Sequence, residues 1–156
     1  VFKKTPPNVG VDLLFVDGED YGDFGEMTDV LVGSMFFAAD IKHMNYKPIY
    51  GVLWDMIGDR DLRIAREPNS LSAAPEVVKR VWEVAESMGY KKYFVPETYP
   101  DPITDDHIPL IRAGLRVIDV IDMDYPYHHR VTDTIDKISA ESLKIVGDVA
   151  TALVTR

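Results

Sequence analysis

The sequence has no cysteine among its 156 residues, which excludes disulfides, thiolate catalysis and cysteine-based zinc sites. No apolar run approaches the roughly 20 residues that a membrane-spanning helix needs. Gly-x-Ser-x-Gly, phosphate-loop and Gly-x-Gly-x-x-Gly motifs are missing, so neither a serine hydrolase nor a nucleotide-binding enzyme is indicated. Basic residues are in deficit, 17 against 26 acids for a net charge of -9, which argues against a nucleic-acid-binding surface.

What is present is typical of a soluble globular protein, with 46% hydrophobic and 28% charged residues. The length suits one compact domain with a real core. The first residue is Val1 and the opening ten residues do not form a signal peptide. We therefore expect a processed product or a fragment of something longer. The lack of cysteine leaves the compartment open.

Apolar runs and helical periodicity alternate along the chain. The predicted strands are Val11–Val16, Ile49–Trp54, Leu62–Ala65, Tyr93–Val95 and Val117–Ile121. The predicted helices run from Thr28 or Asp29 to His43, and over Pro75–Met88, Asp106–Ala113 and Ser139–Val154, the last with Ser139 as N-cap and with Leu143, Val146, Ala150 and Leu153 buried. Such alternation predicts an α/β domain with a mostly parallel sheet, in which ligands bind beyond the carboxyl ends of the strands.

Acidic residues and histidines follow three of these strands and precede one helix. They are Glu19 and Asp20 after the first strand, Asp55 after the second, Asp105 and Asp106 before the third helix, and His128 and His129 after the last strand. Each alone has an ordinary explanation, such as a solvated turn, a helix cap or a surface histidine. Together, carboxylates and an imidazole delivered from separate strand ends suit a divalent metal such as zinc. The surplus acids would supply a general base.

Four motifs, in order, carry a resemblance: LLFVDGEDYG, WDMIGD, TDDHIPLIRAG and HRVTDT. They resemble the glutaminyl cyclase and zinc aminopeptidase family, the co-catalytic zinc exopeptidases, over about residues 11–154. The resemblance implies a three-layer α/β domain with a mostly parallel central sheet flanked by helices. It also implies that residues 1–156 form a single domain, the carboxyl-terminal portion of the family's catalytic domain.

The resemblance implies a role for each acidic motif. Glu19 takes the place of the general base and Asp20 that of a zinc ligand, where the family has a glutamate one methylene longer. Asp55 would bind a second zinc in the two-zinc aminopeptidases, or join the acid network of the one-zinc cyclases. The spacing of the His-x-x-x-Asp-Thr motif selects His129 as a zinc ligand, and Asp105 would join the catalytic acids.

Details of the motifs divide the two branches of the family. Asp105 favours a cyclase, because the cyclases carry a motif similar to Asp-Asp-His-Ile-Pro at this point. Asp119 leans mildly towards the peptidases, because animal cyclases have a histidine at that position, and His128 stands where animal cyclases have a substrate-stacking tryptophan. We therefore expect a zinc-dependent enzyme that converts the N-terminal glutamine of a peptide or protein to pyroglutamate and releases ammonia. The alternatives are an aminopeptidase and a non-catalytic structural or interaction fragment.

The family's earlier half is the largest departure, because it supplies a histidine and a metal-binding aspartate. None of residues 1–10 is either type. The resemblance therefore implies an incomplete zinc site, an exposed apolar surface and a free strand edge. We expect the missing N-terminal half of the domain, or a companion chain, to cover them. Analogy with bacterial family members, which are often exported, favours an exported protein.

Overall fold

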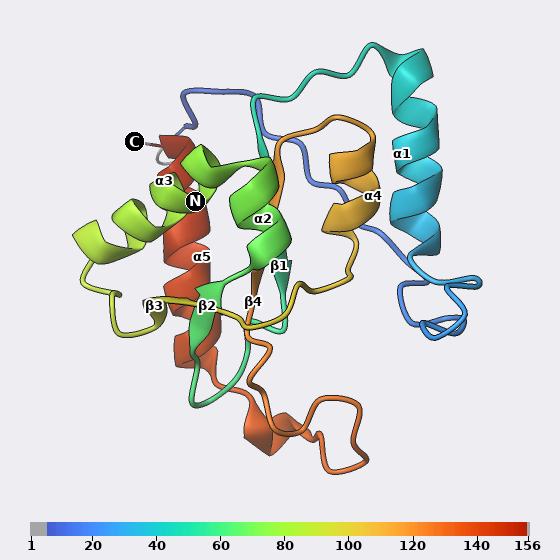
Figure 1. The fold of residues 1–156 in the computed structure, drawn as a ribbon. Helices are drawn as coiled ribbons and strands as arrows, with labels where there is room; N and C mark the ends of the chain where they lie inside the picture. The colour runs from blue at the N-terminus through green and yellow to red at the C-terminus, as the bar shows by residue number, and fades with distance from the viewer. Residues whose placement is uncertain (1–5, 156) are drawn as a thin grey trace.

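The structure is a computed structural model, and it describes residues 6–155. Helices and strands alternate along the chain (Figure 1). In order they are α1 (Val32–Met44), β1 (Gly51–Asp55), β2 (Ile64–Arg66), α2 (Pro68–Ala73), α3 (Pro75–Ser87), β3 (Phe94–Thr98), α4 (His107–Arg112), β4 (Val117–Ile121), the 3-10 helix η1 (Ile135–Lys137) and α5 (Ala140–Thr155). Within the described part of the chain, no helix combines the length and apolar character that crossing a membrane requires.

The strands form two parallel pairs. β1 pairs with β4 in continuous register, from Gly51 opposite Val117 to Asp55 opposite Ile121. β2 pairs with β3, with one irregularity along β2. Because β2 also packs beside β4, the two pairs share one hydrophobic core. The predicted α/β class, with parallel strands flanked by helices, is confirmed.

Helices cover this strand layer, and the core lies beneath them. α3 and α5 pack against each other, α2 and α4 pack against β4, and α1 packs against α4 (Figure 1). The helically spaced residues that the sequence marks on α3 are buried. They are Val77, Val78, Val81, Trp82 and Ala85. This stripe meets Ile118 and Val120 of β4 in the main core, which explains why α3 and β4 lie where the sequence predicts.

α5 begins as predicted, because the Ser139 hydroxyl oxygen accepts a hydrogen bond from the Glu141 N–H at 3.1 Å. Its buried residues are Ser142, Ile145, Val146, Val149, Ala152 and Leu153. The predicted burial of Leu143 is wrong: this side chain is 44% exposed, because it lies at the edge of that stripe. Ala150 is half-buried.

α1 begins later than predicted, at Val32 instead of Thr28 or Asp29. Met27, Asp29 and Leu31 have positive φ angles of 50°, 54° and 54°. A right-handed helix cannot run through left-handed residues, so the chain turns repeatedly before it becomes helical. The sequence pattern did not reveal these turns because none of the three residues is glycine.

The shorter elements lie near their predicted places, with one addition. β2 and β3 overlap the strands predicted over Leu62–Ala65 and Tyr93–Val95, and α4 lies within the helix predicted over Asp106–Ala113. α2 was not predicted from the sequence. It has Pro68 at its first position and Glu67 as its N-cap, a combination that favours a helix start.

The predicted strand at Val11–Val16 is wrong. Within residues 6–155 this segment pairs with no strand, and Leu13 and Phe15 are 73% and 89% exposed. A tertiary contact holds its start, where the Tyr46 hydroxyl donates to Asp12 Oδ2 at 3.0 Å. An apolar run becomes a buried strand only beside a neighbouring strand, and β1 pairs with β4 alone among the described strands. The exposed apolar surface that the family resemblance implies is present.

Candidate active site

The loop that follows Val11–Val16 is held against the start of α1. The carbonyl oxygens of residues 17–19 accept hydrogen bonds from the backbone N–H groups of residues 31–33, at 2.9 to 3.2 Å. A Cβ atom at Gly33 would lie 2.6 Å from the Asp17 nitrogen, so this close approach requires glycine. These contacts fix the position of Glu19 and of Asp20 beside it.

Glu19 lies among four other acidic side chains. Asp20 is its neighbour in the loop, Asp55 ends β1, and Asp105 and Asp106 precede α4. The charges of all four act on Glu19, and we call the five residues the carboxylate cluster. Asp105 and Asp106 are buried, whereas Glu19 and Asp55 are half-buried. The structure thus brings together acids that the sequence places far apart.

Glu19 holds its proton unusually tightly for a glutamate. Burial raises its pKa first, and the negative charges of the other four cluster members raise it further, to about 7. Crowded carboxylates behave this way because each added negative charge disfavours the next ionisation. A group with this pKa exchanges protons readily near neutral pH, as general acid–base catalysis requires.

The neighbouring acids share this effect. Burial, followed by the charges of Asp55 and Asp106, raises the pKa of Asp105 to about 6, although a hydrogen bond from the Asp106 N–H opposes the rise. Burial also raises the pKa of Asp55, which the nearby His128 partly lowers. The cluster can therefore retain a proton near neutral pH.

His129 lies against the outer side of the cluster. Its Nε2 atom is 3.0 Å from Asp20 Oδ2, and both side chains are more than half exposed. The predicted pair of zinc ligands therefore meets, although the two residues are 109 positions apart in the chain. The backbone of His129 is left-handed, with φ 54°. The ring of His128 lies beside that of His129, with centroids 4.0 Å apart.

The distance between Asp20 and His129 fits a zinc ion. Two ligands of a tetrahedral zinc, each about 2.0–2.2 Å from the metal, lie about 3.4 Å from each other. The observed 3.0 Å needs only a small opening to admit the ion. Asp55 is close enough for the Asp20 charge to act on it, which suits its predicted place at a second metal.

A buried polar network lies behind the cluster. Its member His107 lies within a sequence motif and Asp119 was singled out from the sequence, but Glu67 was given no role. Glu67 is fully buried and its Oε2 lies 3.3 Å from His107 Nε2, whose ring presents Nδ1 to Asp119 Oδ2 at 3.7 Å. Burial alone would raise the pKa of Glu67, but the nearby His107 ring and the hydrogen bonds from Asn69 and Ser70 lower it to about 2. Burial drives the pKa of Asp119 well above its ordinary value, and Asp105 adds to the rise. The Glu-Pro helix-start pattern was the one sequence signal for Glu67.

Three residues of this region also offer a candidate metal site of their own. One ligand atom each from Asp105, His107 and Asp119 lies within 4.8 Å of the other two. All three side chains are buried, and Asp119 has no hydrogen-bond partner for either carboxylate oxygen among the described residues. The one separation given within this set, His107 Nδ1 to Asp119 Oδ2 at 3.7 Å, is close to the roughly 3.4 Å between two ligands of a tetrahedral zinc. The described residues therefore contain two places where zinc ligands could meet, this buried set and the exposed Asp20–His129 pair.

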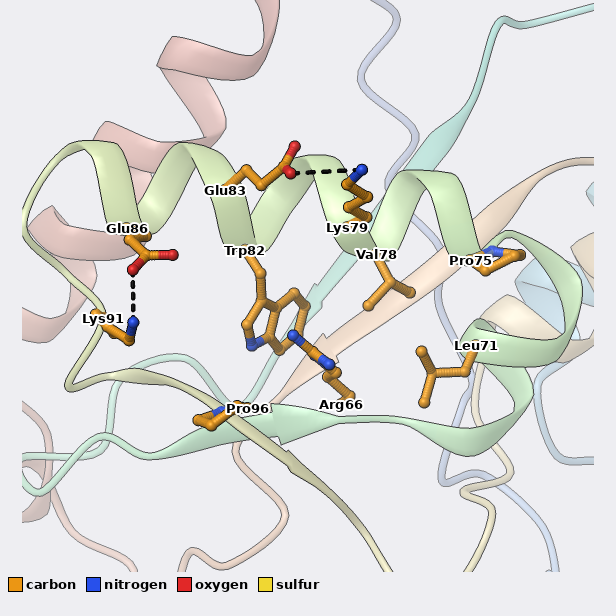
Figure 2. Close-up of a pocket in the computed structure, with 10 residues that line it drawn as sticks. All are labelled: Arg66, Leu71, Pro75, Val78, Lys79, Trp82, Glu83, Glu86, Lys91 and Pro96. Atoms are coloured by element: carbon orange, nitrogen blue, oxygen red, sulfur yellow. Dashed lines mark hydrogen bonds and ion pairs between the residues drawn. The ribbon is translucent and has the colours of Figure 1, made fainter.

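A separate groove lies between α3 and the paired strands β2 and β3 (Figure 2). The guanidinium carbon of Arg66 lies 6.0 Å from the centre of the Trp82 ring at its floor. Lys79 and Glu83 form an ion pair on its rim at 3.7 Å. None of the carboxylate cluster lines this groove, so it shares no residue with the candidate active site.

Comparisons with known proteins show the family and the fold of this chain. The model of Peptidase family M28 matches residues 1–154. A leucine aminopeptidase precursor from Bacteroides thetaiotaomicron has a similar structure, with a TM-score of 0.91 and 32% identity, covering 99% of this chain and 56% of that one. Tannerella forsythia glutaminyl cyclase gives a TM-score of 0.90 and 33% identity, covering 99% of this chain and 57% of the other.

A similar protein in the mouse, Mus musculus, is named glutaminyl-peptide cyclotransferase-like protein. It is 28% identical, and the match covers 85% of this chain and 39% of the mouse protein. The chain therefore spans little more than half the length of the two solved relatives, and less than half of the mouse protein.

Proposed function

This chain belongs to peptidase family M28, and on that premise we propose that it carries the catalytic acids of a zinc enzyme acting at peptide N-termini as a glutaminyl-peptide cyclotransferase. The observation that carries the proposal is the meeting of Asp20 and His129 at 3.0 Å beside Glu19. Asp105 supports the cyclase branch, because its charge acts on Glu19 as a member of one acid network. The names of two similar proteins, the Tannerella cyclase and the mouse cyclotransferase-like protein, support the same branch.

In this proposal Glu19 moves a proton within the substrate. The α-amine of an N-terminal glutamine attacks the side-chain carbonyl carbon, a ring C–N bond forms, and the original amide C–N bond breaks. Glu19 takes the proton that the amine loses and gives it to the departing nitrogen, which leaves as ammonia. Asp55 and Asp105 share a proton and keep the proton affinity of Glu19 near neutral pH.

Asp20 and His129 would hold the zinc ion, as the fit of their separation supports. When bound there, zinc supplies Lewis-acid polarisation of the carbonyl group. Two ligands are fewer than a zinc site needs, so further ligands must come from outside the described residues. Our proposal therefore includes one zinc ion and a second source of ligands.

That second source is the rest of the family domain, provided by the missing N-terminal part or by a companion chain. Leu13 and Phe15 are exposed in the segment that leads to the candidate site, and Phe36 on α1 is 75% exposed. In relatives that match with TM-scores near 0.9, over two fifths of the chain lies outside the matched part and has to pack against some surface. We propose that residues 1–156 are one part of a single domain that is completed over these apolar side chains. By analogy with the family, the completed protein is exported.

An aminopeptidase is the second candidate, and the likeness to the leucine aminopeptidase precursor favours it. In that function Asp55 would hold a second zinc ion, and Glu19 would take a proton from the water that attacks the first peptide bond. Both of these acids belong to the carboxylate cluster. Metal content separates the two: one zinc per chain favours the cyclase and two favour the peptidase.

A substrate comparison tests the proposal directly. The intact protein, meaning this chain together with the part that completes its domain, is incubated with a glutaminyl peptide and, separately, with a leucyl anilide. We expect ammonia from the peptide without any free amino acid. Release of leucine from the anilide would establish the peptidase instead. Turnover of neither substrate by the zinc-loaded intact protein would identify a non-catalytic module and overturn both.

A further inference from the structure

We propose that Glu67 is a positioning residue that clamps the loop carrying Asp105 from both sides. The catalytic part of this inference rests on the proposed function, and its structural part does not. Asp105 lies in the segment between β3 and α4, which contains no regular secondary structure of its own. The Asp106 N–H donates to the Asp105 carboxyl at 2.5 Å, but contacts from outside the segment are needed to place these two residues among the cluster acids.

The clamp consists of two contacts placed symmetrically about Asp105. The Ile103 N–H donates to Glu67 Oε1 at 3.1 Å, two residues before Asp105. His107 Nε2 lies 3.3 Å from Glu67 Oε2, two residues after it. Both Glu67 and His107 are 0% exposed. The Glu67 carboxylate thus contacts the loop on both sides of Asp105, at Ile103 and at His107, where α4 begins.

Glu67 is itself fixed by the start of α2. Its two oxygens accept hydrogen bonds from the backbone N–H groups of Asn69 at 2.8 Å and Ser70 at 2.6 Å. The Ser70 hydroxyl donates to Glu67 at 2.7 Å and accepts from the Asp119 N–H at 2.8 Å, which joins the network to β4. The Asp105 loop is therefore tied to a rigid helix start and to a central strand.

This arrangement is more than a helix cap. A cap needs only the two bonds to Asn69 and Ser70, which a shorter aspartate or serine provides as a rule. Glu67 adds the contacts to Ile103 and His107, and a buried charge retained with such partners is weak evidence for stability alone. The geometry points instead to precise placement of the neighbouring catalytic acid, for which errors near 1 Å cost about 100-fold in rate.

The test uses the intact protein with the substitution Glu67→Gln, which keeps the side-chain size and removes the charge. Glu83→Gln is the matched control, because Glu83 is exposed on α3. We expect Glu67→Gln to lower kcat for the glutaminyl peptide about 10- to 100-fold with KM within about twofold. The control should behave as the wild type. Equal kinetics of Glu67→Gln and the control would overturn the catalytic part.

A double substitution separates positioning from a general loss of structure. If Glu67 acts through Asp105, then Glu67→Gln combined with Asp105→Asn is no slower than Asp105→Asn alone. Effects that multiply would show that Glu67 acts independently and would contradict the proposal. His107→Gln leaves the cap bonds intact and should show the same non-additivity, so it serves if Glu67→Gln fails to fold.

Two further readouts do not depend on activity. Hydrogen exchange of the Ile103 amide should be at least about 10-fold faster in Glu67→Gln than in Glu83→Gln, and unchanged exchange would overturn the clamp even if neither substrate is turned over. The zinc content per chain should be the same in His107→Gln and the wild type. A bound ion lost from His107→Gln would make Asp105, His107 and Asp119 a metal site instead of a clamp, which would also overturn the proposal.

Discussion

Two apolar runs of this chain are similar in residue type, but one is a buried strand and the other is exposed. Val117–Ile121 is β4, buried at every position, whereas Val11–Val16 is unpaired within the described residues and largely exposed. The difference does not lie in hydrophobicity. β4 has β1 on one edge and β2 close by, with α2 and α4 packed against it, and Val11–Val16 has no such strand neighbours among residues 6–155. An apolar run becomes a strand through what lies next to it.

The largest effect that we expect from this difference is on the stability of the chain alone. Ile118→Ala in β4 should lower the free energy of unfolding by about 2–5 kcal/mol, because it leaves a cavity in a fully packed core. Phe15→Ala should change it by less than about 0.5 kcal/mol, because Phe15 is 89% exposed. Urea unfolding followed by circular dichroism measures both. Similar losses for the two variants would show that the two runs are not in different environments.

Completing the domain should make the two runs alike. In the intact protein, we expect amide hydrogen exchange across Val11–Val16 to slow at least about 100-fold relative to the chain alone, because the amides gain strand partners. The amides of β4 should change little, since their partners are already present. Exchange of Val11–Val16 that stays fast in the intact protein would show that this segment is not a strand of the domain.

The proposed zinc site beyond the end of the exposed run offers a contrast between two adjacent residues. His129→Ala should weaken zinc binding by the intact protein at least about 10-fold, because its Nε2 faces Asp20. His128→Ala is the control, with the same change of side chain one position earlier. We expect its zinc affinity to stay within about threefold of the wild type by isothermal titration calorimetry, because the removed ring is not a ligand. A larger loss from His128→Ala would reverse the assignment.

The smallest effect is the pH dependence of stability in the metal-free chain. Glu19 and Asp105 have folded pKa values of about 7 and about 6, above their ordinary 4.5 and 3.8, so the folded state binds more protons between about pH 4 and 7. Their contribution to stability is therefore lost as pH rises through that range. The pKa of Glu67, lowered to about 2, acts oppositely and loses stability as pH falls from about 4.5 to 2.

We accordingly expect maximum stability near about pH 4.5, measured by urea unfolding at about pH 3, 4.5 and 7.5. Glu19→Gln should flatten the decline above that maximum, and Glu83→Gln should not. A chain whose stability rises steadily over the upper part of this range would show that the cluster carboxyls are not crowded in the folded state.

The contrast between the two runs also explains what the sequence could and could not predict. α3, β4 and the Ser139 cap were predictable because their signals are local: helical spacing, a continuous apolar run and a capping hydroxyl. Val11–Val16 carries the same local signal as β4, but no strand among the described residues lies beside it to bury it. Local patterns report that a segment can be buried, and only its neighbours decide whether it is.

The candidate site divides in the same way. Glu19, Asp20 and His129 belong to motifs that resemble a family, so their meeting could be predicted across the whole chain. Glu67 belongs to none of the motifs used, and its contacts to Ile103 and His107 depend on α2, a helix that was not predicted from the sequence. A residue that acts by holding another becomes visible only when the fold places the two together.

The decisive experiment compares the rate of ammonia release from a glutaminyl peptide by the intact, zinc-loaded protein and by its Glu19→Gln variant. We expect the variant to fold, to bind zinc like the wild type and to lose at least about 100-fold in kcat, because its amide cannot accept the amine proton. A Glu19→Gln variant that keeps its zinc and releases ammonia at the wild-type rate would remove Glu19 from the mechanism and contradict the proposed function.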